Sequence, residues 1–150
     1  MIDFKNKIHQ QLIQDLEDKL KHISKAIETS MQARDSETKS SMGDKYETGR
    51  AMAQSEIDKL ANNKISCKNQ LNELKNLNPE IKSNIITSGS LVETNHETFY
   101  FSIPFGKVSV NNKEVFVISP YSPIGMVLKS KKVGDTIEFK GKTYTVTNVS

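Results

Sequence analysis

Two carboxylates stand three residues apart in the segment GDKYET, residues 43–48, where a polar loop turns into a helix. At this spacing Asp44 and Glu47 share one face of a helix. Mg²⁺ prefers hard oxygen ligands and commonly takes only one or two carboxylates from one protein, so the pair can serve as metal ligands. The same residues can instead cap the helix, with Asp44 at the N-cap and Glu47 at N3, in an Asp variant of the capping box. The two roles are compatible, because an oxygen that is not used for capping can still bind a metal.

Two amphipathic helices are expected to hold these acids. Each has apolar residues at spacings of three, four or seven, which is typical of a helix with one buried face. Small polar residues at 36–43 separate the helices, and the LNP at 77–79 is a stop signal for the second. We therefore expect an antiparallel coiled-coil hairpin over residues 1–77, with the two acids at its tip. The two stripes are Ile8, Leu12, Leu16, Leu20, Ile23 and Ile27, then Ala53, Ile57, Leu60, Cys67, Leu71 and Leu74.

Residues 85–150 are rich in β-branched and aromatic residues and predict a small sheet domain. Within this domain SPIGMVLKS predicts one short helix, with Ser122 as N-cap and Pro123 at the first helical position. The fold class is thus α+β, a helical hairpin followed by an antiparallel sheet with one helix, and residues 78–84 form the linker. The expected strands lie in IITSGSLVET, ETFYFSIPF, GKVSV, KEVFVIS, GDTIEFK and KTYTVTNVS, with turns at NNK and KGK.

The composition restricts the class of protein. The chain has 150 residues and a net charge of +3, which is too small to indicate nucleic-acid binding by itself. No apolar run is long enough to cross a bilayer, and the start MIDFKNKIHQ lacks the apolar core of a signal peptide. The single Cys67 cannot form an internal disulfide. We expect a cytoplasmic monomer without a membrane partner.

The other chemically active side chains are expected to be structural. Cys67 lies on the second apolar stripe and is interpreted as a small core residue. His9, His22 and His96 show no ligand spacing and are interpreted as surface residues.

Two motifs together resemble one protein family. SPIGMVLKSKKVGDTIEF resembles the signature of the C-terminal domain of the bacterial Gre transcription elongation factors, in which a Ser-Pro turn, a short helix, a K-x-G-D type turn and a strand follow in this order. GDKYET lines up with the G-D-x-x-E-N motif at the tip of the family's hairpin. The order of parts also matches, and the resemblance implies an FKBP-like fold for residues 85–150.

The resemblance implies a specific function. Gre factors dock their C-terminal domain at the rim of the RNA polymerase secondary channel and insert the hairpin toward the active centre. Two acids at the tip help to hold a catalytic Mg²⁺ and its attacking water, which stimulates the polymerase to cleave backtracked nascent RNA. By position these acids are Asp44 and Glu47, and Ser122 and Pro123 match the Ser-Pro turn associated with docking. The chain would then be no enzyme on its own, because the polymerase supplies the rest of the site.

Three alternatives stay open. Lys45, Tyr46 and Thr48 depart from the family's tip, so the hairpin could regulate the polymerase without stimulating cleavage. Asp35 and Glu37 are further acids near the tip, and they could contribute to its function. The generic hairpin is also compatible with a coiled-coil adaptor that does not bind polymerase.

A peptidyl-prolyl isomerase is the alternative from another class, since the implied fold is FKBP-like. Such an activity needs an apolar pocket lined by aromatic residues. The candidates are Phe99, Tyr100, Phe101, Phe105 and Phe116, although strand alternation sends several of them to the ordinary core.

Overall fold

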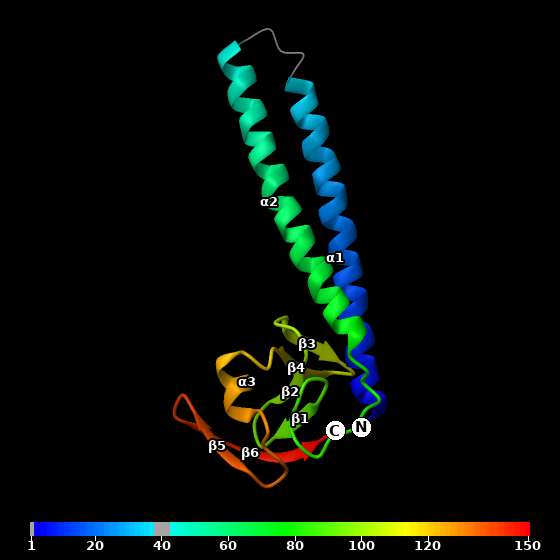
Figure 1. Cartoon of the computed structure of the whole chain (residues 1–150), viewed down its shortest axis with the longest axis vertical. Helices are drawn as coiled ribbons and strands as arrows, with labels where there is room; N and C mark the ends of the chain where they lie inside the picture. Colours follow the sequence, from blue (N-terminus) through cyan, green and yellow to red (C-terminus); the bar gives the residue numbers. More distant parts are fainter. Residues whose placement is uncertain (1, 38–42) are drawn as a thin grey trace. The chain divides into compact units, whose positions relative to one another are not determined.

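The computed structural model describes the backbone of residues 2–37 and 43–150, and the side chains of residues 2–36 and 48–150. Two long helices come first, followed by a six-stranded sheet with one short helix (Figure 1). The predicted α+β fold, a helical hairpin followed by a sheet domain, is confirmed.

The hairpin consists of α1 (Ile2–Glu37) and α2 (Gly43–Asn76), which pack side by side (Figure 1). The predicted stripes form the contact between them. The thiol of Cys67 is 1% exposed and donates a hydrogen bond to the Leu16 carbonyl at 3.4 Å, which confirms it as a core residue. Leu20, Ile27, Ala53 and Leu60 are half-buried, and the remaining stripe residues are buried: Ile8, Leu12, Leu16, Ile23, Ile57, Cys67, Leu71 and Leu74.

All six predicted strands are present. They run in the spatial order β3-β4-β2-β1-β6-β5. Two of the turns between them need positive φ, as the sequence indicated: Asn111 and Asn112 have φ of 53° and 62°, and Lys140 and Gly141 have φ of 53° and 76°. Such pairs match the two-residue hairpin turns that favour Asn and Gly. The strands are β1 (Leu91–Thr94), β2 (Thr98–Phe101), β3 (Gly106–Val110), β4 (Lys113–Ile118), β5 (Thr136–Phe139) and β6 (Lys142–Val149).

The expectation of a wholly antiparallel sheet is wrong for one pair. β2 and β4 are parallel, with Phe99 opposite Phe116, while the other pairs are antiparallel. The cause is the connection between β2 and β3. After β2 the chain leaves one strand position empty and returns in the opposite direction as β3, and the β3–β4 hairpin then fills that position. The chain reverses direction once between β2 and β3 and again between β3 and β4, so β4 runs parallel to β2.

The central strand β2 is buried along its whole length because both faces of the sheet are covered. Successive residues of a strand point to opposite faces. Phe99 and Phe101 belong to the core on the side of the short helix α3 (Pro123–Leu128), which contributes Leu128. Tyr100 points the other way, toward the first turns of α1. The core on the side of α3 consists of Ile86, Val92, Phe99, Phe101, Leu128, Ile137, Tyr144 and Val146.

The contacts divide the chain into two compact units. The first comprises residues 1–13 and 72–150, and the second comprises residues 14–71. The predicted linker, residues 78–84, lies within the first unit. In the part of the chain that the structure describes, none of the helices has the length and apolar character that a membrane crossing requires.

Candidate functional site

The two tip acids lie at the start of α2. The helix begins at Gly43, one residue before the predicted N-cap, so Asp44 and Glu47 are the second and fifth residues of the helix. The assignment of Asp44 as N-cap is therefore wrong, because an N-cap at Asp44 implies a helix that starts at residue 45, and α2 starts two residues earlier. Both acids still lie near the positive end of the helix dipole. Their side chains, and that of Glu37, lie outside the described residues.

A side-chain network joins the two helices near this end of the hairpin. Nε of Arg34 lies 3.3 Å from Oδ1 of Asp35, and Nη1 of Arg34 donates to Oε1 of Gln54 at 2.9 Å. Gln54 in turn donates to Oδ1 of Asp58 at 3.0 Å. Arg34 belongs to α1 and Gln54 to α2, so the network holds the helices in register. Asp35 is thus already paired with a cation.

The chemistry of the tip donors fits Mg²⁺. Carboxylate oxygens are the hard ligands that this ion prefers, and it usually keeps several waters or phosphate oxygens. Asp44 and Glu47 could supply at most part of an octahedral shell, and a partner must supply the rest. Among the side chains that the structure describes, no three His, Cys, Asp or Glu residues gather in a way that could hold a metal ion.

The predicted Ser-Pro turn is built as the sequence indicated. Ser122 is the N-cap of α3, with φ −65° and ψ 157°, and Pro123 occupies the first turn. The Oγ of Ser122 accepts a hydrogen bond from the Gly125 amide at 3.1 Å and donates one to the Ser119 carbonyl at 2.7 Å. The hydroxyl therefore satisfies an amide of the helix and ties the helix to the end of the preceding loop.

Gly125 is required for this turn to close. A Cβ at this position would meet the Ser119 carbonyl oxygen in severe overlap, Oγ of Ser122 at 2.7 Å and the carbonyl carbon of Pro120 at 3.1 Å. Two of these neighbours are backbone atoms, which cannot move aside as the end of a flexible side chain can. Only glycine permits this close approach between α3 and the turn.

Two large exposed side chains flank the turn and were missed in the sequence. Tyr121 is 80% exposed and Met126 is 67% exposed. Nζ of Lys129 lies 5.7 Å from the centre of the Tyr121 ring. The two side chains place apolar area on the surface beside the polar turn. We call this set the Ser-Pro surface: Tyr121, Ser122, Pro123, Met126 and Lys129.

A small hollow opens between the sheet and α3. Its volume is about 150 Å³. The ring of Phe99 lies 6.1 Å, between centroids, from the ring of Phe116 and also from that of Tyr144. We call it the aromatic hollow, and its lining residues are Glu97, Phe99, Phe116, Ile124 and Tyr144.

Only two of the five aromatic residues considered for an isomerase pocket line the aromatic hollow. These are Phe99 and Phe116, whereas Tyr100 and Phe101 are fully buried and Phe105 does not line it. Tyr144 lines the hollow but was not among the candidates. Its alternation with Val146 along β6 places both on the core side, and this was the available signal.

A buried polar group in the first compact unit also escaped the sequence reading. His9 was interpreted as a surface residue, which is wrong, since it is only 5% exposed; His22 and His96 are exposed as expected. Nδ1 of His9 lies 2.8 Å from the Tyr100 hydroxyl. Lys5, one helical turn earlier, is fully buried and donates to the Ile81 and Gly89 carbonyls, both at 3.0 Å. Lys5 and His9 continue the apolar stripe at a spacing of four, but their polarity concealed it.

Burial sets the pKa values of this group. It lowers the pKa of His9, and nearby Lys5 lowers it further, while a hydrogen bond that the ring donates to the Leu74 backbone carbonyl opposes the change. It also lowers the pKa of Lys5, with Lys82 acting in the same direction. Burial raises the pKa of Tyr100. Each shift favours the uncharged form, as expected for groups removed from water.

We expect acid to destabilise the protein through His9. Below about pH 6.5 the unfolded chain binds a proton at this residue that the folded chain rejects, so unfolding becomes more favourable. The free energy of unfolding should fall by at most about 1.4 kcal/mol per pH unit in this window. Urea unfolding at pH 7, 6 and 5 measures it, and His9→Gln should reduce the dependence while His22→Gln, at an exposed site, should not. An unchanged dependence in His9→Gln would contradict the assignment.

Comparison with models of protein families found no family that matches this chain, and comparison with curated proteins found no match.

Proposed function

We propose that this protein is a Gre-type transcription elongation factor. It binds the secondary channel of RNA polymerase and stimulates cleavage of backtracked RNA through the carboxylates of Asp44 and Glu47. The observation that supports this most directly is the place of these acids. They lie in the opening turns of α2, and the preceding helix α1 ends at Glu37, so the acids stand at the end of a two-helix hairpin.

The dimensions of the hairpin suit delivery of the acids into a channel. The 34 residues of α2 correspond to about 51 Å at ~1.5 Å per residue. A narrow apolar stripe lies between the helices, and the exposed sides carry mostly polar and charged residues, with Met31, Met52 and Ile65 as exposed apolar exceptions. Such a rod can enter a water-filled passage without a further apolar partner.

The chemical step belongs to the partner as much as to this chain. Two metal ions can stabilise the attacking and leaving oxygens when a phosphodiester is cleaved. Asp44 and Glu47 would hold a Mg²⁺ together with ligands of the polymerase, and their carboxylates would orient the attacking water. The chain therefore acts as a cofactor protein rather than as an enzyme.

The Ser-Pro surface is the proposed docking site. Ser122 and Pro123 match the docking turn of the family that the sequence resembles, and the exposed Tyr121 and Met126 add apolar anchors. Aromatic anchors often contribute a large share of the binding free energy at interfaces. Docking and catalysis are thus assigned to different parts of the chain.

A cleavage-inactive regulator of the polymerase is the second candidate, and the tip sequence favours it. Lys45 lies between the two acids in sequence, and its ammonium can neutralise part of their charge. No comparable observation supports the prolyl isomerase or the adaptor, and both stay predictions.

Two measurements test the proposal on the unmodified protein. Affinity capture from a lysate of the source organism should recover RNA polymerase as the main partner, and the protein should release short RNA from backtracked complexes of that polymerase. Capture of polymerase without RNA release would favour the regulator. Failure to capture polymerase would overturn the proposal and favour an adaptor.

A further inference from the structure

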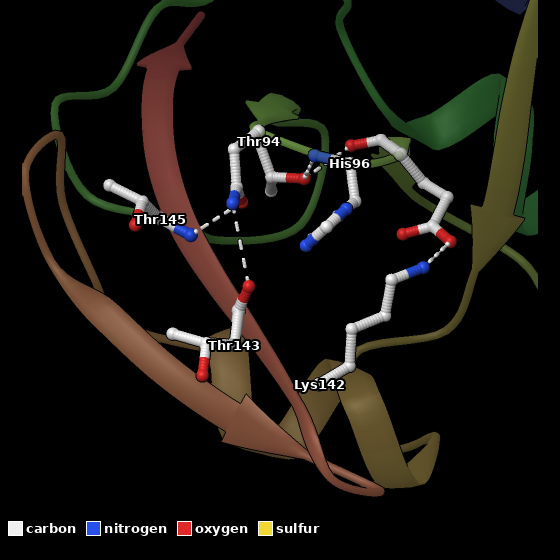
Figure 2. A network of polar contacts seen from close by, with 7 residues as sticks. Thr94, His96, Lys142, Thr143 and Thr145 are labelled. Carbon is white, nitrogen blue, oxygen red and sulfur yellow. Dashed lines mark hydrogen bonds and ion pairs between the residues drawn. The ribbon is translucent and has the colours of Figure 1, made fainter.

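The turn between β1 and β2 holds Glu97 rigidly beside the aromatic hollow. The Thr94 hydroxyl donates to the Glu97 carbonyl at 2.7 Å and accepts from the His96 amide at 3.1 Å (Figure 2). Oδ1 of Asn95 accepts from the Thr145 amide at 2.8 Å, which ties the turn to β6. A side chain on such a fixed backbone is preorganised for binding.

The Glu97 carboxylate uses only one of its two oxygens. Oε1 accepts from Nζ of Lys142 at 2.8 Å (Figure 2). Oε2 is buried from water and has no hydrogen-bond partner in the described part of the chain. Burial acts to raise the pKa of Glu97, but the hydrogen bond from Lys142 and the nearby Tyr144 hydroxyl outweigh it and hold the pKa below its usual value. An ionised oxygen without a donor is costly, so a ligand that supplies a donor gains free energy.

The surroundings of this oxygen suit a flat cation. Nζ of Lys142 already lies 5.5 Å from the centre of the Tyr144 ring, so the hollow places a cation over an aromatic ring next to a carboxylate. His96 packs edge-on against Tyr144, with the two ring centroids 5.3 Å apart. A guanidinium group stacks on aromatic rings and forms charge-assisted hydrogen bonds with carboxylates, and it is less strongly hydrated than an ammonium.

We propose that the aromatic hollow binds an arginine side chain of a partner protein, with the guanidinium against the aromatic rings and an N–H donated to Oε2 of Glu97. The size agrees, since a hollow of about 150 Å³ has room for several waters and so for the end of one side chain. The negative oxygen in an apolar lining supplies the charge complementarity. Since Lys142 already balances the charge of Glu97, a second compact ammonium is a poorer ligand than a delocalised guanidinium. This inference does not depend on the proposed function at the polymerase.

The test is a titration of the full chain with blocked tripeptides Ac-Gly-X-Gly-NH₂, in which X is arginine, citrulline, lysine or proline. Citrulline has nearly the shape of arginine but no charge. Backbone amide chemical shifts of residues 94–97 and 142–145 report binding, and those of residues 62–66 on α2 serve as the internal reference. The arginine peptide should bind with a dissociation constant at least about tenfold lower than the citrulline peptide, a difference of ~1.4 kcal/mol.

Two variants separate the carboxylate from the hollow itself. Glu97→Gln should raise the dissociation constant of the arginine peptide by about tenfold or more, because an amide oxygen is uncharged. Lys142→Met should lower it, because both carboxylate oxygens then become available to the guanidinium. A merely structural role of the pair would weaken binding in both variants. Glu114→Gln is the matched control, since Glu114 also forms an ion pair, with Lys107 at 3.1 Å, and lies outside the hollow.

Three results would overturn the proposal. The first is equal binding of the arginine and citrulline peptides, and the second is unchanged binding of arginine to Glu97→Gln. The third is a preference for the proline peptide at the same amides, which would assign the hollow to a prolyl group and favour the isomerase instead.

Discussion

Replacing Asp44 by Asn and Glu47 by Gln together is expected to lower stimulated RNA cleavage by about 10²-fold or more, with polymerase binding retained. Neutral amides are much poorer Mg²⁺ ligands than carboxylates, and metal stabilisation of a phosphoryl transition state is worth several kcal/mol. The fold should change little. Each acid contributes ~0.3–1 kcal/mol through the helix dipole, so the free energy of unfolding should fall by about 1–2 kcal/mol at most. The measurement is the rate of RNA release from backtracked complexes, together with urea unfolding of the free protein.

The control for this double variant removes the same two charges elsewhere on α2. Glu56 and Glu73 are exposed and lie away from the tip, so Glu56→Gln with Glu73→Gln should leave cleavage unchanged. The tip variant should also compete with the unmodified protein for polymerase, because docking is assigned to the Ser-Pro surface.

Two outcomes would contradict the roles of the tip acids. If the tip variant binds polymerase and still stimulates cleavage fully, Asp44 and Glu47 are not the metal ligands. Asp35 and Glu37 then become the candidates, and Asp35→Asn with Glu37→Gln should abolish the activity. If the unmodified protein binds without stimulating cleavage, the acids stabilise the start of the helix and the protein is a regulator.

Gly125→Ala is expected to have the largest effect on the stability of the first compact unit, which contains the sheet. The added methyl group overlaps the Ser119 carbonyl oxygen, and overpacking of this kind typically costs ~1–3 kcal/mol. Relief requires α3 to move away from the turn, which breaks the hydrogen bonds of Ser122 at 3.1 and 2.7 Å. We therefore expect a lower free energy of unfolding and at least tenfold weaker polymerase binding, about 1.4 kcal/mol, even where the protein remains folded.

Two comparisons isolate the effect of the close approach. Gly49→Ala adds the same methyl group within α2, where it should stabilise by ~0.5–1 kcal/mol, because glycine is unfavourable inside a helix. Tyr121→Ala removes an exposed ring, so it should weaken polymerase binding with little change in stability. Normal binding and stability of Gly125→Ala would show that the turn can open without cost, and that the docking assignment to Ser122 and Pro123 is wrong.

Features that depend on neighbours in the sequence were predictable. The spacing of apolar residues gives the two helices, since a period near 3.6 places them on one face. The cap formed by Ser122 and Pro123 follows from a hydroxyl and a fixed φ at adjacent positions. The turns at Asn111 and Gly141 follow from residues that tolerate positive φ. Even here α2 begins at Gly43, two residues before the start that an N-cap at Asp44 implies, because capping preference alone does not locate the first helical residue.

Features that depend on distant parts of the chain required the tertiary structure. The parallel pairing of β2 with β4 results from the path of β3, and no local pattern records which strand position is left open. His9 was interpreted as a surface residue, and no local pattern marked Lys5 as buried, yet Gly89 and Tyr100, more than 80 positions away, contribute hydrogen-bond partners to these two residues.

The two candidate binding surfaces differ in the same way. The residue types of the Ser-Pro turn identified it in the sequence. The reason for its glycine became visible only in the structure, where the backbone of Ser119 and Pro120 lies within contact of a Cβ at Gly125. The aromatic hollow joins Glu97 after β1, Phe116 on β4, Ile124 on α3 and Tyr144 on β6. The sequence determines each of these side chains and the strand or helix that carries it. Only the folded sheet brings the carboxylate, the rings and the cation of Lys142 together, because burial and charge pairing arise between segments that the chain itself keeps far apart.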